Sequence, residues 1–248
     1  FAEPLDDAQG DEIERQGDSF NQHQVEFGWY SALRQLGLAV DFASPDHDLT
    51  PYQLVIAPCM PIVSPDFVER CKATQATLVF GPRSGAKTAE LSAVPNLGPG
   101  LLQQLIDVKV LSTETIRPDC YAGLSLNGDQ TSYQSSRWRE ELAPGANVVV
   151  LAQDEFQQPA VVQQGNVVYV GTLSCEGFLI ALFRQLATQL GLPVWQLGSD
   201  LRTMQRGQLQ FVFNYGATAQ QFIAPENADF VIGSSTLQPY DVAVLRLH

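Results

Sequence analysis

The chain has 248 residues, of which 45% are hydrophobic and 17% are charged, a composition typical of a globular protein with a substantial core. Its formal net charge is −13, because 27 acidic residues outnumber 14 basic ones. This negative charge argues against nucleic acid or an anionic membrane surface as a partner. No apolar run reaches the roughly 18 residues that a membrane span needs, so we expect a soluble protein. Its cysteines form no Cys-x-x-Cys pair, and we expect free thiols in a reducing cytoplasm.

The first segment of the chain, residues 1–20, carries seven carboxylates and a single basic residue, Arg15. These carboxylates do not follow the spacing of a calcium-binding loop. We therefore expect an acidic, mobile leader rather than a metal site. Because the chain begins with Phe1 rather than Met, we expect a mature product or a piece of a longer protein.

Residues 21–193 show the alternation of helices and strands that is typical of an α/β domain. In the first half the patterns predict a helix over 22–36, a strand over 38–43, a buried strand over 53–57, a helix over 65–73 with Ser64 as its N-cap, and a buried strand over 76–80. Strands separated by helices in this way pair in parallel.

The second half of this region is rich in strands. The patterns predict a short helix over 101–106, a strand beginning at Val108, strands over 120–126, 147–152, 160–163 and 167–171, and a helix over 178–190. Asn127-Gly128 and Gln164-Gly165-Asn166 have the residues of hairpin turns. Beyond Trp195 the apolar period changes from 3.6 to 2, with strands expected over 209–213, 221–223, 230–232 and 242–245. We therefore predict a small antiparallel β domain over 194–248.

A functional site in a parallel sheet lies at the carboxyl ends of its strands. Here these ends are Ala57-Pro58-Cys59-Met60-Pro61 and Gly81-Pro82-Arg83-Ser84-Gly85. A nucleophile at such an elbow needs a base within hydrogen-bond reach, and none of the three histidines, His23, His47 and His248, follows a strand in the second half of the α/β region. We therefore interpret Ser84 as part of a structural turn and Arg83 as a residue that makes ion pairs or an interface contact.

Other candidate sites are weak. The four cysteines, Cys59, Cys71, Cys120 and Cys175, form no Cys-x-x-Cys pair, so free thiols are expected. The glycines of 81–88 do not have phosphate-loop spacing, Asp46-His47-Asp48 is typical of a solvated turn, and Glu140-Glu141 is interpreted as an exposed pair. We predict no catalytic residue, no metal and no cofactor.

Several segments together resemble the part of glycoside hydrolase family 42 β-galactosidases that follows the catalytic barrel. The segments resembling the middle domain of that family are 29–41, 48–58 and 81–88, and those resembling its small C-terminal domain are 213–216 and 237–245. The resemblance covers the chain from about residue 20 to its end.

The resemblance implies a modular enzyme. Its parts would be an N-terminal (β/α)8 barrel that hydrolyses β-galactosides with retention, an amidotransferase-like, flavodoxin-like α/β domain that forms trimers, and an antiparallel β domain. The catalytic glutamates of the family belong to the barrel and have no counterpart in this chain. The resemblance also implies an apolar first strand before a segment like 1–20, which is reduced here to Phe1-Ala2. We expect a non-catalytic chain that self-associates, supports the active-site rim and meets galactosides only through the barrel.

Two alternatives remain open. The chain could be an amidotransferase-like hydrolase that uses Cys59 or Ser84. It could also be a carbohydrate-binding module in which Tyr215 and Tyr240 of the C-terminal sheet stack on sugar rings.

Overall fold

The computed structural model describes residues 21–195, 197–225 and 228–248. The predicted leader over 1–20 and the reduced strand at Phe1-Ala2 lie outside the described residues. Those that are described form two compact units, the first made of 21–27 and 42–178 and the second of 28–41 and 179–248. Each unit is considered by itself below.

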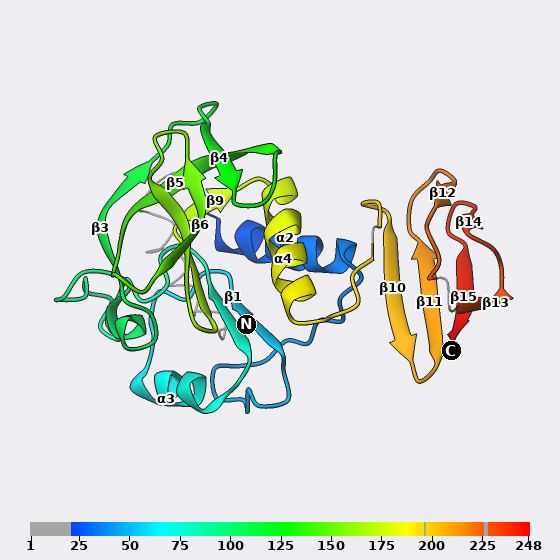
Figure 1. The fold of residues 1–248 in the computed structure, drawn as a ribbon, viewed down its shortest axis with the longest axis horizontal. Helices are drawn as coiled ribbons and strands as arrows, with labels where there is room; N and C mark the ends of the chain where they lie inside the picture. The colour runs from blue at the N-terminus through cyan, green and yellow to red at the C-terminus, as the bar shows by residue number, and fades with distance from the viewer. Residues whose placement is uncertain (1–20, 196, 226–227) are drawn as a thin grey trace. The chain divides into compact units, whose positions relative to one another are not determined.

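The first unit is built on a nine-stranded mixed sheet (Figure 1). Its strands are β1 (Leu54–Ala57), β2 (Thr77–Phe80), β3 (Val108–Thr115), β4 (Ala122–Leu126), β5 (Ser132–Pro144), β6 (Val149–Asp154), β7 (Pro159–Gln164), β8 (Val167–Val170) and β9 (Thr172–Ser174). The order is β1-β2-β8-β7-β6-β4-β5-β3, with β9 beside β5. Only β1, β2 and β8 are parallel to one another, and the remaining pairs are antiparallel. The parallel strands predicted from the sequence are thus one part of a larger mixed sheet.

Helix α3 (Pro65–Ala73) connects β1 to β2, and a 3-10 helix, η1 (Gly100–Gln104), follows β2. The hydroxyl of Ser64 accepts a hydrogen bond from the backbone N–H of Phe67 at 3.2 Å, which confirms Ser64 as the N-cap. Every residue of β2 and β8 is buried, as expected for parallel strands covered on both faces.

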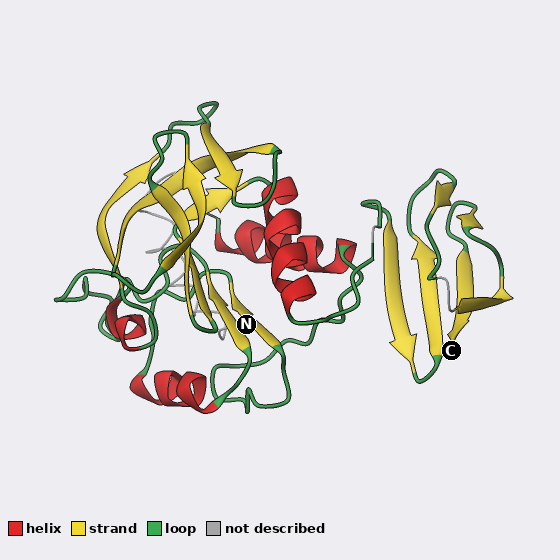
Figure 2. Ribbon diagram, in the orientation of Figure 1, coloured by secondary structure: helices red, strands yellow, loops and turns green. Residues whose placement is uncertain are grey.

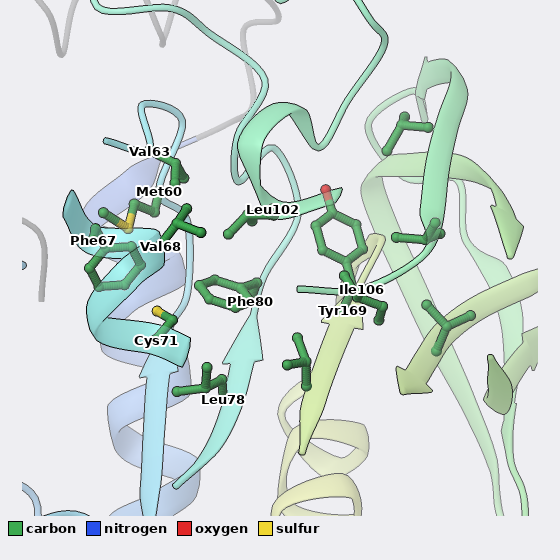
Figure 3. Packing of buried hydrophobic residues seen from close by; sticks show 14 of the residues in the cluster. Met60, Val63, Phe67, Val68, Cys71, Leu78, Phe80, Leu102, Ile106 and Tyr169 are labelled. Carbon is green, nitrogen blue, oxygen red and sulfur yellow. The ribbon is translucent and has the colours of Figure 1, made fainter. Parts of the chain in front are cut away.

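The core of the first unit lies between these strands and α3. Figure 3 shows Phe67 and Cys71 of α3 pointing toward Phe80 and Leu78 of β2, with Tyr169 of β8 beyond them. The rings of Phe67 and Phe80 meet edge to face, with centroids 6.3 Å apart. Core packing thus fixes the strand ends that carry the candidate site.

One predicted element does not form, and the longest strand of the sheet was missed. No strand forms over 38–43, because these residues pair with no strand of the described sheets, and the backbone N–H of Leu38 instead donates to the carbonyl of Leu33 in the cap of the preceding helix. Strand β5, the longest in the sheet, was not predicted. It contains a positive-φ residue, Arg137, and a register shift between Ser135 and Arg139, so its side chains do not alternate regularly.

The second unit contains the end of helix α2 (Gln22–Gln35), most of helix α4 (Glu176–Gln189) and a four-stranded antiparallel sheet. The strands of this sheet are among the yellow arrows of Figure 2. Its strands are β10 (Leu201–Arg206), β11 (Leu209–Asn214), β15 (Val242–Leu247) and β13 (Ala228–Ile232), in that order, and β12 (Gln220–Gln221) pairs separately with β14 (Thr236–Leu237). The small antiparallel sheet is confirmed, although β10 was not predicted. None of the helices in the described ranges is long and apolar enough to cross a bilayer.

The turn after α2 is bonded to the sheet of the second unit. The guanidinium of Arg34 donates to the carbonyls of Leu38 at 2.7 Å and Thr203 at 2.8 Å. The backbone N–H of Trp195 donates to the carbonyl of Leu36 at 2.9 Å. Gly37 has φ +74°, and a Cβ there would lie 2.6 Å from the Trp195 ring. Only glycine fits this turn.

Candidate functional site

The candidate site lies at the carboxyl ends of β1 and β2, in the first unit. The two connections there are tied together, because the Ser84 hydroxyl accepts a hydrogen bond from the backbone N–H of Met60 at 3.1 Å and the N–H of Gly85 donates to the Met60 carbonyl at 2.9 Å. Gly85 has φ +67°, and a Cβ added to it would lie 1.9 Å from the carbonyl oxygen of Pro99. The elbow after β2 is therefore a closely packed turn.

Arg83, not Ser84, occupies the strained position of this elbow. Its φ is +67°, the left-handed conformation that a nucleophile takes in a Gly-x-Ser-x-Gly elbow. The sequence Gly81-Pro82-Arg83-Ser84-Gly85 thus has an arginine in the place of the nucleophile. An arginine is a permanent cation and cannot attack a carbonyl.

The Arg83 side chain is buried, with 3% of its surface exposed. Its guanidinium carbon lies 5.1 Å from the centroid of the Trp138 ring, a cation–π contact. Burial lowers the pKa of Arg83, whereas the negative charge available at Cys59 and Glu140 raises it. The charge is therefore held inside the protein by an aromatic face and a nearby carboxyl group.

That carboxyl group belongs to Glu140, and its prediction as an exposed residue was wrong. Only 6% of Glu140 is exposed, whereas Glu141 is exposed as predicted. The carboxylate of Glu140 accepts three hydrogen bonds, from the backbone N–H of Arg83 at 2.7 Å, the indole N–H of Trp138 at 3.2 Å and the hydroxyl of Tyr169 at 2.8 Å. Burial raises the pKa of Glu140, and these donors together with the Arg83 charge offset part of the rise.

Glu140 was missed because its partners are remote in sequence. Arg83 lies 57 residues before it and Tyr169 lies 29 residues after it. A period-2 pattern over Trp138, Glu140 and Leu142 could have indicated an inward face, since all three are buried. The charged residues between them obscured that pattern.

Cys59 is buried beside this cluster and does not have the properties of a nucleophile. Burial raises the pKa of its thiol to about 12, although Arg83 acts in the opposite direction. The thiolate, the reactive form, is therefore scarce at neutral pH. The histidines have partners elsewhere, with His23 near Glu26, His47 near Ser44 and His248 near Asp229. The arrangement does not support the amidotransferase-like alternative.

The remaining candidates are dispersed. Asp46 pairs with Arg70 at 3.2 Å, and Asp48 accepts hydrogen bonds from Thr50, which lower its pKa. Nowhere in the described ranges do three His, Cys, Asp or Glu side chains gather closely enough to hold a metal ion. Two of the cysteines, Cys59 and Cys71, are buried, and Cys120 and Cys175 are exposed, all four as free thiols.

The aromatic residues of the C-terminal sheet lie on its solvent side. Tyr215 and Tyr240 are 66% and 75% exposed. The Tyr215 ring lies 6.0 Å from the Phe213 ring, which is in turn stacked parallel to the Phe211 ring at 6.2 Å. The carbohydrate-binding alternative stays a prediction.

Comparison with known proteins agrees with the resemblance. Residues 7–193 match the family described as "Beta-galactosidase trimerisation domain", and residues 200–247 match "Beta-galactosidase C-terminal domain". The (β/α)8 barrel implied by the resemblance has no counterpart among the described residues. The exact boundary between 193 and 194 stays a prediction.

Relatives of this chain include β-galactosidases that are much longer than the chain itself. That of Thermus thermophilus is 33% identical over 233 residues, which cover 94% of this chain and 36% of the relative. BgaH of Haloferax lucentense is 28% identical, covering 88% of this chain and 34% of the relative.

Solved structures show the same relationship. The β-galactosidase of the psychrophilic Marinomonas ef1 has a TM-score of 0.87 at 28% identity and covers 96% of this chain and 35% of its own. That of Bacillus circulans sp. alkalophilus, with a TM-score of 0.81 at 22% identity over 93% of this chain and 38% of its own, shows the shared fold alone. The chain therefore belongs to the β-galactosidase trimerisation-domain family of glycoside hydrolase family 42, joined to the C-terminal domain of the same enzymes, and it spans about 36% of the length of the curated relatives it matches.

Proposed function

We propose that this chain is the self-association and C-terminal portion of a larger β-galactosidase and that it performs no catalysis itself. The observation that carries this proposal is the buried Arg83 at the elbow position where a hydrolase of this fold would hold its nucleophile. Glu140 compensates the arginine charge from inside the core. A site built in this way stabilises the fold rather than receiving a substrate.

The proposed assembly is a trimer, supported by the family description of residues 7–193. In this proposal galactosides are bound by the barrel of the parent enzyme, which takes part in carbohydrate metabolism. The four free cysteines favour a reducing compartment, and we propose the cytoplasm.

Arg83 and Ser84 were predicted as binding or interface residues. Their exposed fractions of 3% and 1% favour an internal role. We propose that both residues support the assembly indirectly, by fixing the elbow on which neighbouring loops pack.

Light scattering coupled to size-exclusion chromatography tests the assembly. We expect a mass of three chains at micromolar concentration, and a chain that stays monomeric at the highest attainable concentration would contradict the proposal. A chromogenic β-galactoside tests the absence of catalysis in the same sample. We expect no release of the chromophore, and turnover that copurifies with the chain would refute a non-catalytic role.

A further inference from the structure

A cavity of about 290 Å³ opens in the first unit. Ser135 and Thr172, both buried, contribute to its interior. Its walls carry Glu114, Arg139, Glu141 and Asp154, and Phe156 lies at its edge. Glu140 also borders the cavity, but both of its carboxylate oxygens accept hydrogen bonds from the elbow cluster. Of the residues that line the cavity, the function proposed above uses Glu140 alone.

The charged wall of the cavity is held in a fixed arrangement. Arg139 pairs with Glu114 at 2.6 Å and with Asp154 at 3.3 Å, and its guanidinium carbon lies 5.7 Å from the Phe156 ring centroid. The second oxygen of Asp154 accepts hydrogen bonds from the backbone N–H groups of Phe156 and Gln158, each at 2.9 Å. Ion pairs and turn hydrogen bonds therefore pre-organise this wall.

The chemistry of the wall restricts the class of ligand. Three carboxylates against one guanidinium repel an anion, and an apolar molecule would leave these charged groups without the hydrogen bonds that water gives them. The described residues include no cluster of three His, Cys, Asp or Glu side chains suited to a metal ion. Two of the three carboxylates, Glu114 and Asp154, are already paired with Arg139, which reduces the negative charge offered to an organic cation. A polyol matches both kinds of group, because its hydroxyls donate to carboxylates and accept from the N–H groups of arginine.

The size of the cavity points to one sugar ring. It has room for roughly ten water molecules at about 30 Å³ each, and it lies just below the usual range of ligand pockets. The Phe156 ring, 64% exposed, gives the apolar CH face of a sugar a surface at the rim.

We propose that this cavity binds a monosaccharide, with galactose as the expected ligand. The identity of the sugar rests on the proposed function, since galactose is the product that the parent enzyme would release. The contacts are few and the cavity is open to solvent, so the dissociation constant is expected on the order of a few millimolar.

Saturation-transfer NMR on the full chain, with galactose as the probe, tests the site. We expect saturable transfer to galactose that putrescine, an organic dication, does not displace. Phe156→Ala and Glu141→Gln should each weaken binding about tenfold. Both side chains are exposed, so the variants are expected to fold. The matched controls Tyr121→Ala and Glu90→Gln change exposed residues outside the cavity and should leave binding unchanged.

Other results would overturn the proposal. Absence of saturation transfer to galactose would refute sugar binding by this cavity. Transfer that persists in both cavity variants would show that galactose binds elsewhere on the chain. Displacement by putrescine shows a cation site instead. The oligomeric mass of the same samples is measured in parallel, so that a failure of sugar binding is distinguished from a failure of self-association.

Discussion

The carboxylate of Glu140 accepts a hydrogen bond of 2.7 Å from the backbone N–H of Arg83, across 57 residues of chain. This contact joins β5 to the elbow after β2, two elements that are not neighbours in the sheet. It positions a negative group beside the buried guanidinium and satisfies the N–H of a residue in a strained conformation. Arg83 thus lies at the elbow position that holds the nucleophile in a Gly-x-Ser-x-Gly motif, and Glu140 bonds to its backbone.

Removal of the Glu140 carboxylate should strongly destabilise the first unit. Glu140→Ala removes the acceptor of three hydrogen bonds in the core, and the loss of such acceptors costs about 3 kcal/mol or more in total. Urea unfolding measures the change in the free energy of unfolding. Glu141→Ala, at the exposed neighbouring position, is the control and should change it by less than about 0.5 kcal/mol. Equal effects of the two variants would contradict the assigned role of Glu140.

The turn at Gly85 should not tolerate a side chain. Gly85→Ala combines a left-handed φ of +67° with a Cβ 1.9 Å from a backbone oxygen, so we expect a loss of more than about 3 kcal/mol. Gly165→Ala has a similar φ of +57° with open space around it and should cost only about 1–2 kcal/mol. Thermal and urea unfolding give the free energy of unfolding of both variants. The difference between their losses separates the cost of the steric clash at Gly85 from the cost of the left-handed backbone that both positions share.

The four cysteines should divide into two pairs by reactivity. In the native chain iodoacetamide at pH 8 should modify Cys120 and Cys175, which are exposed. Cys59 and Cys71 should react only after unfolding, because burial raises the pKa of each thiol to about 12. Peptide mapping by mass spectrometry identifies the modified cysteines. Rapid modification of Cys59 in the native chain would show that its thiol is accessible to solvent and would contradict its burial.

Stability should fall at alkaline pH. In the unfolded chain the Cys59 thiol ionises near pH 9, whereas in the folded chain its pKa is about 12. Between these values the folded state binds more protons, so the Cys59 thiol alone lowers the free energy of unfolding by about 1.4 kcal/mol per pH unit. Cys59→Ala should reduce this slope, and Cys120→Ala, which changes an exposed thiol, should not. An unchanged slope in Cys59→Ala would contradict the burial of the thiol.

The amino-acid sequence alone determined the elements whose signals are local. Ser64 and Pro65 mark the start of α3, the apolar run of β2 marks a buried strand, and Gly165 marks a hairpin turn. Caps, apolar runs and turn residues act on their immediate neighbours, so these predictions were confirmed. The residue series that resembles family 42 likewise indicated the relationship that the family matches show.

Only the tertiary structure decided which charges are buried and which residue occupies the elbow. Glu140 and Glu141 are chemically alike, and a strand directs one to the core and the other to solvent. Arg83 and Ser84 are likewise neighbours, and the backbone conformation at the end of β2 selects Arg83. The residues 38–43 read as a strand, but a strand requires a pairing partner, and the described chain provides none for them. Each outcome depends on contacts between residues far apart in the chain, which local patterns do not encode.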